Sequence, residues 1–138
     1  VYGPGEAAHR FIPKAIEASL MNKHFVLCEG AHDWVYVDDV VNAMILVAAN
    51  AEAYKGEVVN IGTGEQYSNS YIIDRIAIIT GRSIQYSWDN SMRPHDSDIW
   101  YADNRKMRRI GWHYRHIDEG LKETIQWYEK QRSKTKNH

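Results

Sequence analysis

An arginine and an aspartate three positions apart stand in the stretch MRPHDSDIWYADNRKMRRIGW, which covers residues 92–112. Pro94 biases Arg93 towards an extended backbone, and the arginine side chain offers a planar fork of donors that suits phosphate oxygens. The carboxylate of Asp96 is able to accept hydrogen bonds from two neighbouring hydroxyls. Together the two side chains fit a nucleoside diphosphate. A surface Arg–Asp ion pair of little energetic value has the same spacing, so spacing by itself leaves both interpretations open.

Four further residues, His32, Asp33, Arg10 and Tyr2, carry polar side chains next to predicted elements. His32 and Asp33 precede a predicted strand and either line a cleft or serve as a solvated histidine and a turn-capping aspartate. Arg10 precedes the first predicted helix and faces either solvent or an anion. Tyr2 precedes a Gly-Pro-Gly turn and belongs either to the core or to the cleft. We carry His32, Arg10 and Tyr2 forward as candidate ligand-binding residues.

Several motifs of chemistry-bearing proteins are missing from the sequence. It contains no G-x-G-x-x-G, no G-x-x-x-x-G-K-[ST] and no Tyr-x-x-x-Lys, and the segment NIGTGE has only the length of a turn. The single cysteine and the scattered histidines form no metal-ligand pattern, and the pair His113 and His116 lacks a nearby third ligand. The sequence therefore predicts no metal site, no bound cofactor and no catalytic residue within this chain.

Composition and charge exclude two classes of partner. The net charge of −1 provides no field that would draw the chain onto nucleic acid. The basic residues Arg105, Lys106, Arg108 and Arg109 lie on one short predicted helix without interleaved aromatic residues, so a solvated helix face is favoured over a nucleic-acid patch. No apolar run is long enough to span a bilayer. We expect a cytoplasmic protein that binds neither nucleic acid nor membrane.

Hydrophobic periodicity predicts one small, mixed α/β lobe with short strands and about five helices. The helix predicted over residues 39–56 is expected to bury Val40, Val41, Met44, Ile45, Val47 and Ala48. Ser68 or Ser70 is expected to cap the next helix, which Gly81 ends. The lobe is predicted over residues 1–131, and the polar residues 132–138 are predicted to be a disordered tail. Predicted strands cover 24–30, 33–39, 56–64 and 83–88, and predicted helices cover 10–24, 39–56, 68–81, 104–110 and 116–131.

Four stretches, in this order, resemble the C-terminal half of the extended short-chain dehydrogenase/reductases, the NAD-dependent nucleotide-sugar epimerases and dehydratases. They are VYGPGE, HDWVYVDDVVNAMILV, VVNIGTGEQYS, and RPHDSDIWYADNRKMRRIGW followed by DEGLKETIQWY. The resemblance extends over nearly the whole chain. It implies that this chain is the substrate-binding lobe without the Rossmann half, and that the Rossmann domain, in cis or in trans, supplies NAD and the catalytic residues. The chain opens abruptly on a Gly-Pro-Gly turn, which agrees with this expectation.

The resemblance also assigns roles by position. Arg93 matches the family arginine that grips the diphosphate, and Asp96 matches the acid that reads the ribose hydroxyls. The strand HFVLCEG, which contains Val26, resembles the segment that flanks the nucleotide base, and Arg10 falls where a basic residue approaches the ligand. One departure concerns position 32, where the family usually has arginine: His32 is a shorter donor that is charged only when protonated.

These observations leave two main functions open. The chain either binds a nucleotide-diphosphate sugar and positions it for hydride transfer by an absent domain, or it is a non-catalytic interaction module derived from that lobe. Apolar surface without its partner domain would favour a homodimer in the second case. On its own the chain is expected to be inactive, and the base and the sugar are not specified by the sequence.

Overall fold

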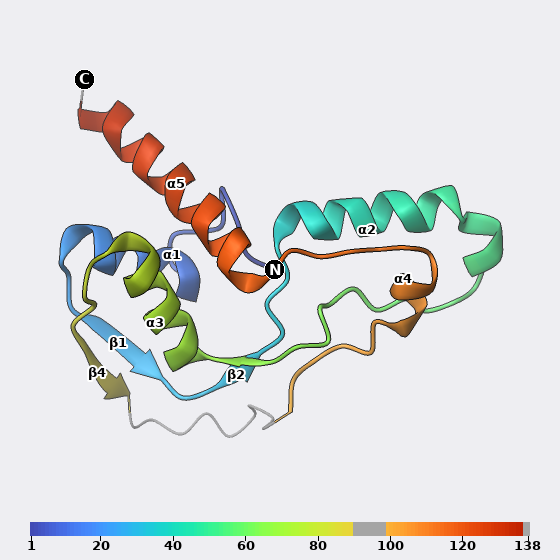
Figure 1. Cartoon of the computed structure of the whole chain (residues 1–138), viewed down its shortest axis with the longest axis horizontal. Helices are drawn as coiled ribbons and strands as arrows, with labels where there is room; N and C mark the ends of the chain where they lie inside the picture. Colours follow the sequence, from blue (N-terminus) through green and yellow to red (C-terminus); the bar gives the residue numbers. More distant parts are fainter. Residues whose placement is uncertain (90–98, 137–138) are drawn as a thin grey trace.

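The computed structural model describes residues 1–89 and 99–136 of the chain (Figure 1). The elements follow one another along the chain as α1 (Phe11–Met21), β1 (Phe25–Cys28), β2 (Ala31–His32), α2 (Val37–Ala49), the 3₁₀ helix η1 (Ala51–Tyr54), β3 (Tyr67–Ser68), α3 (Asn69–Thr80), β4 (Tyr86–Asp89), α4 (Arg105–Arg109) and α5 (Ile117–Lys136). The predicted fold class, a small mixed α/β lobe with five α-helices and short strands, is confirmed.

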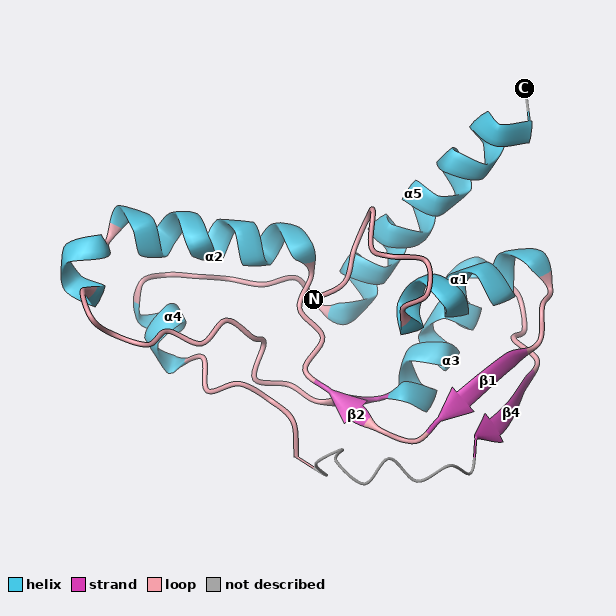
Figure 2. Cartoon of the chain, turned by 180° about the vertical axis from the view of Figure 1, so that it is seen from behind, coloured by secondary structure: helices cyan, strands magenta, loops and turns pink. Residues whose placement is uncertain are grey.

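The sheets are small. β1 pairs with β4 in parallel, with Phe25 opposite Tyr86 and Cys28 opposite Asp89, and β2 pairs with β3 in antiparallel orientation over two residues. In the described part of the chain no sheet has more than two strands. Figure 2 shows β1 and β4 at one end of the molecule and β2 between them and α2.

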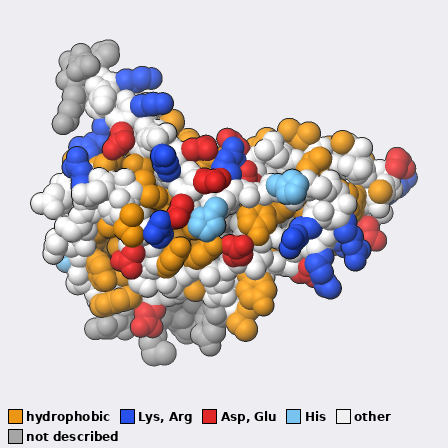
Figure 3. Space-filling view, in the orientation of Figure 1, with side chains coloured by type: hydrophobic (Ala, Val, Ile, Leu, Met, Phe, Trp, Pro, Cys, Tyr) orange, Lys and Arg blue, Asp and Glu red, His pale blue; other side chains and the backbone are white. Residues whose placement is uncertain are grey.

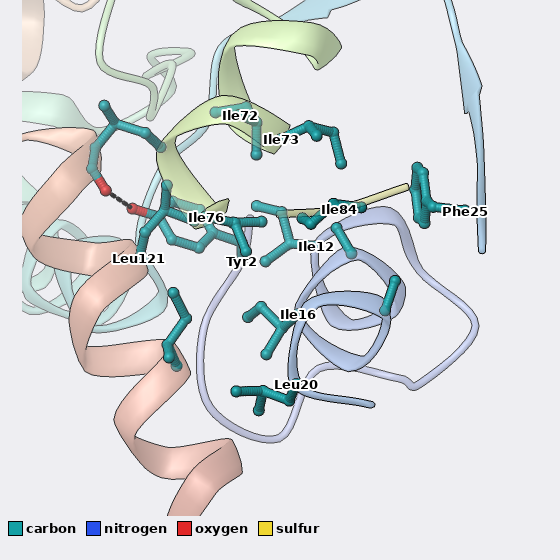
Figure 4. Close-up of a cluster of buried hydrophobic side chains, with 14 of the residues drawn as sticks. Tyr2, Ile12, Ile16, Leu20, Phe25, Ile72, Ile73, Ile76, Ile84 and Leu121 are labelled. Atoms are coloured by element: carbon teal, nitrogen blue, oxygen red, sulfur yellow. Dashed lines mark hydrogen bonds between the residues drawn. The ribbon is translucent and has the colours of Figure 1, made fainter. Parts of the chain in front are cut away.

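The main core is formed where α1, α3 and α5 pack together beside β1 (Figure 4). Apolar residues recur at helical spacing along α1 and α3, so that one face of each helix is buried. Ser68 caps α3 by accepting a hydrogen bond from the Tyr71 amide, and Gly81 ends the helix in a left-handed conformation, as predicted. The fully buried side chains include Ile12, Ile16, Leu27, Ile72, Ile73, Ile76 and Leu121.

A second, smaller core lies between α2 and α4 and contains Val35, Ala43, Met107 and Trp112. The indole N–H of Trp112 donates to the backbone oxygen of Asp39 (2.9 Å), which fixes the last loop against the start of α2. Figure 1 shows this part of the molecule extending away from α1, α3 and α5. The chain therefore has two packed regions joined by its extended segments.

Three expectations about residues 33–64 are wrong. The prediction that α2 buries its long apolar stripe fails, because Val41, Met44 and Ile45 are 47%, 61% and 61% exposed while Ala43 and Asp39 are buried. The strand predicted over 33–39 is reduced to a single parallel bridge between Tyr2 and Tyr36, because α2 already begins at Val37, and residues 56–64 form a loop. A strand needs a neighbouring backbone to pair with, and an apolar helix face needs a layer of residues to cover it. Among the described residues, no backbone pairs with residues 56–64 and no layer covers the exposed face of α2.

The C-terminal helix is longer than expected. Residues 132–136, predicted to belong to a disordered tail, lie in α5, which ends at Lys136.

The packing of Gly120 in α5 leads to a first prediction. A Cβ at this position would lie 2.0 Å from the hydroxyl and 2.9 Å from Cζ of Tyr2, a side chain that is 2% exposed. The Tyr2 hydroxyl donates to the Ile117 carbonyl (3.3 Å; dashed in Figure 4), so a shift of the ring away from a new Cβ would strain or break a buried hydrogen bond. We expect Gly120→Ala to lower the free energy of unfolding in urea by about 2 kcal/mol, although alanine is the better helix former.

The matched control is Lys122→Ala, an exposed substitution in the same helix, which is expected to change stability by less than about 0.5 kcal/mol. Adding Tyr2→Phe removes the closest atom, so the double variant should lose less stability than the sum of the two single variants. Equal or greater stability of Gly120→Ala would contradict this account of the core.

Candidate functional site

A cleft with a volume of about 740 Å³ lies between α1, β1, the loop after β2 and the segment that follows residue 98. Its wall is formed by Arg10, Phe11 and Lys14 from the start of α1, and by Val26 and Cys28 from β1. The cleft is completed by His32 from β2, by Asn69 from the start of α3, and by Asp33, Trp34 and Trp100 from loops. The cleft therefore collects side chains that lie far apart in the sequence.

Three of the six candidate residues meet in this cleft, because Arg10, Val26 and His32 all line it. Val26 is 59% exposed and projects from the outer face of β1. Tyr2 does not line the cleft: it is buried between Tyr36 and α5, and burial raises the pKa of its phenol. The core alternative for Tyr2 therefore holds, and we drop it as a ligand-binding residue. Arg93 and Asp96 lie outside the described residues.

Charge on the α1 side of the cleft is organised around Glu6 and Arg10. Arg10 Nε donates to Glu6 Oε1 (3.3 Å), while the other carboxylate oxygen of Glu6 is buried. Burial raises the pKa of Glu6, and the hydrogen bond from Arg10 opposes that rise. The side chain of Arg10 keeps 59% of its surface exposed, so this guanidinium remains available to an anion entering the cleft.

Aromatic rings form the middle of the cleft. The His32 ring stands edge-on to Trp34 (5.4 Å between centroids) and to Trp100 (6.0 Å). Trp34 in turn stacks on Phe11 (5.7 Å). These contacts position the His32 ring between two indoles. Flat apolar walls with a few polar groups are typical of small-molecule sites.

Asp33 joins three chain segments behind this aromatic wall. Its Oδ1 accepts hydrogen bonds from the amide and the hydroxyl of Thr63 (2.8 and 2.7 Å). Its Oδ2 accepts from the amides of Gly64 (2.9 Å) and Ala102 (3.0 Å). Gly62 is required beside it, since a Cβ there would lie 2.7 Å from Asp33 Oδ2 and 2.6 Å from the Ala102 Cβ. Asp33 thus holds the turn at residues 62–64 and the chain after Trp100 against the cleft.

The hydrogen bonds to Asp33 also bear on whether the turn at residues 62–64 is able to bind the phosphates of a dinucleotide. The glycine-containing turn at residues 62–64 precedes α3, and two of its amides already donate to Asp33. Those N–H groups are therefore not available to phosphate oxygens. This turn therefore does not fit the pyrophosphate of NAD.

The basic helix α4 and the pair His113 and His116 do not line this cleft. Arg105 pairs with Asp103 (2.5 Å) and Lys106 with Glu57 (2.6 Å), and Figure 3 shows Lys and Arg side chains gathered over α4. Among the described residues, no group of three or more His, Cys, Asp or Glu side chains has the arrangement of a metal site. A search of these residues for a helix able to cross a membrane finds none.

Sequence reasoning missed the polar atoms that the cleft leaves unsatisfied. Glu6 Oε2, Trp34 Nε1 and Asn69 Oδ1 are buried and have no hydrogen-bond partner in the part of the chain that is described. All three residues line the cleft. Unpaired polar atoms are rare in protein interiors, and these three belong to residues that line the same cavity. An asparagine directly after a helix-capping serine was the available signal, but it is typical of helix starts in general.

Comparisons with known proteins agree with this architecture. Residues 1–62 match the model of the NAD dependent epimerase/dehydratase family. A dTDP-D-glucose 4,6-dehydratase of Mus musculus is 30% identical to this chain, in an alignment that covers 99% of the chain and 41% of the relative.

Two solved structures are similar over 94% of this chain. MoeE5 in complex with UDP-glucose and NAD has 30% identity and a TM-score of 0.83, with 44% of its own chain covered. The UDP-glucose 4-epimerase of Thermotoga maritima with UDP-glucose has 28% identity and a TM-score of 0.81, with 43% covered. The chain therefore spans less than half the length of these proteins. The shared fold, the agreement in sequence and the family match together show that the chain belongs to the NAD-dependent epimerase/dehydratase family.

Proposed function

We propose that this chain binds a nucleotide-diphosphate sugar in the cleft and positions it for hydride transfer, as the substrate-binding lobe of an NAD-dependent epimerase or dehydratase. The observation that carries the proposal is the meeting of Arg10, Val26 and His32 in one cleft. Before residues 90–98, Asp89 pairs with the cleft residue Cys28 on β1, and after them Trp100 lines the cleft wall.

In this proposal each residue has a defined role. Arg93 binds the diphosphate with its planar fork of donors, and Arg10 adds a second positive charge. Asp96 accepts hydrogen bonds from the ribose hydroxyls. Val26 packs against the base, and His32 contacts the diphosphate as a conditionally charged donor. Binding energy gained at the nucleotide then holds the sugar in place for a reaction carried out by another domain.

The named ligands of similar proteins support the class of ligand. MoeE5 is known in complex with UDP-glucose and NAD, and the Thermotoga maritima epimerase with UDP-glucose. The mouse relative is a dTDP-D-glucose 4,6-dehydratase. These proteins all handle a hexose carried by a pyrimidine nucleoside diphosphate.

The proposal is tested by titration calorimetry of the 138-residue chain with UDP-glucose, dTDP-glucose and GDP-mannose. We expect saturable binding of at least one of them, with free glucose as the negative control. A chain that is folded by circular dichroism yet binds none of the three would disprove the proposal.

A second prediction concerns chemistry. The sequence contains no Tyr-x-x-x-Lys, and the turn that precedes α3 has its amides bound to Asp33. We therefore expect the chain by itself to form no NADH from NAD⁺ and any of these sugars, as followed by the absorbance of NADH. Adding a Rossmann-containing member of the family as a positive control checks the assay. Stoichiometric NADH formed by the chain without that control protein would contradict the prediction.

One observation favours a further role as an interaction module. The face of α2 formed by Val41, Met44 and Ile45 is exposed, as is Val58 (78%), and Figure 3 shows hydrophobic atoms along α2. Exposed apolar area of this kind marks an interface. We propose that the face packs against the Rossmann domain, in cis or in trans, or against a second copy of this chain. If a copy covers it, Met44→Lys with Ile45→Lys turns a dimer into a monomer in analytical ultracentrifugation, while ligand binding persists.

A further inference from the structure

Glu6 places a carboxylate in the wall of the cleft, directly beside Arg10. The side chain of Glu6 is 13% exposed, whereas that of Arg10 is 59% exposed. Oε1 of Glu6 accepts a hydrogen bond from Arg10 Nε (3.3 Å), and Oε2 is buried without a hydrogen-bond partner among the described residues. The cleft wall therefore contains a largely buried negative charge whose hydrogen-bonding capacity is only partly used.

Arg10 is the group that does most to keep Glu6 ionised. Burial disfavours the charged form of a carboxyl group and raises the pKa of Glu6, while the hydrogen bond and the charge of Arg10 lower it. The α-amino group of Val1 and the side chain of His9 lower the pKa of Glu6 to a smaller extent. From α5, the hydroxyl of Tyr128 donates to the backbone oxygen of Glu6 (3.2 Å) and not to its carboxylate. Glu6 therefore depends mainly on Arg10 for its negative charge.

The same guanidinium is the one that the cleft offers to an anionic ligand. A guanidinium carries several N–H donors, and the bond to Glu6 occupies one of them. A diphosphate makes its best contact with an arginine through paired N–H donors. The Glu6 carboxylate competes for these donors, and its negative charge also repels the diphosphate. An anionic ligand and the ionised form of Glu6 therefore oppose each other at Arg10.

We propose that Glu6 is an internal competitor for Arg10: its carboxylate holds the guanidinium at the cleft wall until a diphosphate displaces it and Glu6 takes up a proton. This inference rests on the proposed function, since it assumes that a nucleotide-diphosphate sugar enters the cleft. The proton comes from solvent and returns to solvent when the ligand leaves. Glu6 thus makes ligand binding sensitive to pH through an arginine that it does not share with the ligand.

The direction of the pH dependence follows from the contacts of Glu6. When Arg10 turns to the diphosphate, the group that lowers the pKa of Glu6 is lost and a negative charge arrives, so this pKa rises further in the complex. Binding therefore favours the protonated form. Affinity is highest at a pH below the pKa of Glu6 and falls as the pH rises through it. The diphosphate of a sugar nucleotide is a diester and keeps its charge over this range.

The test compares the native chain with Glu6→Gln, which is neutral at every pH and close in shape to a protonated glutamate. The ligand is whichever of UDP-glucose, dTDP-glucose and GDP-mannose binds the native chain most tightly, and calorimetry is performed from about pH 7.5 to about pH 5. We expect Glu6→Gln to bind about 5-fold more tightly than the native chain at the upper pH, and the two affinities to converge within about 2-fold at the lower pH. Histidines such as His32 affect both proteins alike, so the difference between the two profiles reports Glu6. Weaker binding by Glu6→Gln at the upper pH would show that Glu6 orients Arg10 for the ligand, and would overturn the inference.

A double-mutant cycle shows whether Glu6 acts through Arg10. In an Arg10→Ala background, Glu6→Gln should change affinity by less than about 2-fold, because the donor for which the carboxylate competes is gone. An equal gain in both backgrounds would mean that Glu6 only repels the ligand, and displacement at Arg10 would be wrong. Glu57→Gln is the matched control: it removes an exposed carboxylate that pairs with Lys106 outside the cleft, and it should leave affinity unchanged.

The outcomes distinguish this inference from the proposed function. Saturable binding with the same pH profile in the native chain and in Glu6→Gln overturns the role of Glu6, while the proposed function stands. A folded chain that binds none of the three sugar nucleotides at any pH in the range overturns the proposed function, and displacement at Arg10 with it. Circular dichroism at each pH shows whether the compared proteins are folded.

Discussion

Replacing Arg93 with alanine is expected to weaken the binding of nucleotide-diphosphate sugars by the chain at least 100-fold. In our proposal the guanidinium forms paired, charge-assisted hydrogen bonds with the diphosphate inside a cleft flanked by indole rings. Hydrogen bonds to charged groups contribute about 1.5–3 kcal/mol each, so the loss of a bidentate pair corresponds to roughly 3 kcal/mol. Titration calorimetry with the tightest-binding sugar nucleotide measures the loss.

Two companion variants show whether shape or charge accounts for the effect. Arg93→Lys keeps the charge but not the planar fork, and we expect it to lose about 10-fold in affinity. Arg105→Ala removes an exposed arginine of α4 that pairs with Asp103 outside the cleft, and it should leave affinity unchanged. Equal losses for Arg93→Ala and Arg105→Ala would mean that only net charge matters, and the assignment of Arg93 would be wrong.

The helices of the main core were predictable because they depend on local signals. Ile12, Ile16 and Leu20 recur at helical spacing on α1, and the same spacing recurs on α3. The cap at Ser68 and the left-handed stop at Gly81 involve only neighbouring residues. Where pattern, cap and stop agree, a helix follows from a short window of sequence.

The strands and the α2 face were not predictable in the same way. Val58 and Val59 are β-branched and suit a strand, but pairing requires a neighbouring backbone that no local pattern specifies. α2 is apolar around most of its circumference, so the sequence alone does not decide which side meets Trp112 and which remains exposed. Burial at these positions is set by tertiary contacts.

The candidate site was likewise predictable only in part from the sequence. Arg10 and His32 were selected by their places beside predicted elements, and Val26 by resemblance; all three line one cleft. Tyr2, selected for its place before the Gly-Pro-Gly turn, is part of the core. Asp33 and Asn69 owe their importance to hydrogen bonds across 30 or more residues. An isolated sequence gives no sign of such bonds.

Replacing Asp33 with alanine is expected to have the largest effect on stability, a loss of about 4 kcal/mol of unfolding free energy. The substitution removes the acceptor of four hydrogen bonds, from the amide and hydroxyl of Thr63 and from the amides of Gly64 and Ala102. Thr63 is 6% exposed, so water does not readily replace the lost partner. Urea unfolding followed by circular dichroism measures the change. The loss is large relative to the total stability of a domain, about 5–15 kcal/mol.

Asp33→Asn provides the measurement if the alanine variant does not fold. Its amide oxygen is able to keep both bonds from Thr63, but its NH₂ group would then face the amides of Gly64 and Ala102, donor against donor. We expect about half the loss in stability. Asp103→Ala, which removes an exposed partner of Arg105, is the matched control and should cost less than about 1 kcal/mol.

The Asp33 variants also connect stability to the site. The bond from the Ala102 amide holds the chain two residues after Trp100, and Trp100 contacts His32 in the cleft wall. We therefore expect Asp33→Asn to weaken sugar-nucleotide binding about 10-fold under conditions where it is fully folded, because the aromatic wall is no longer held in place. If Asp33→Asn loses stability but binds as the native chain does, Asp33 supports only the fold; if it loses neither, the four-bond network does not form in solution.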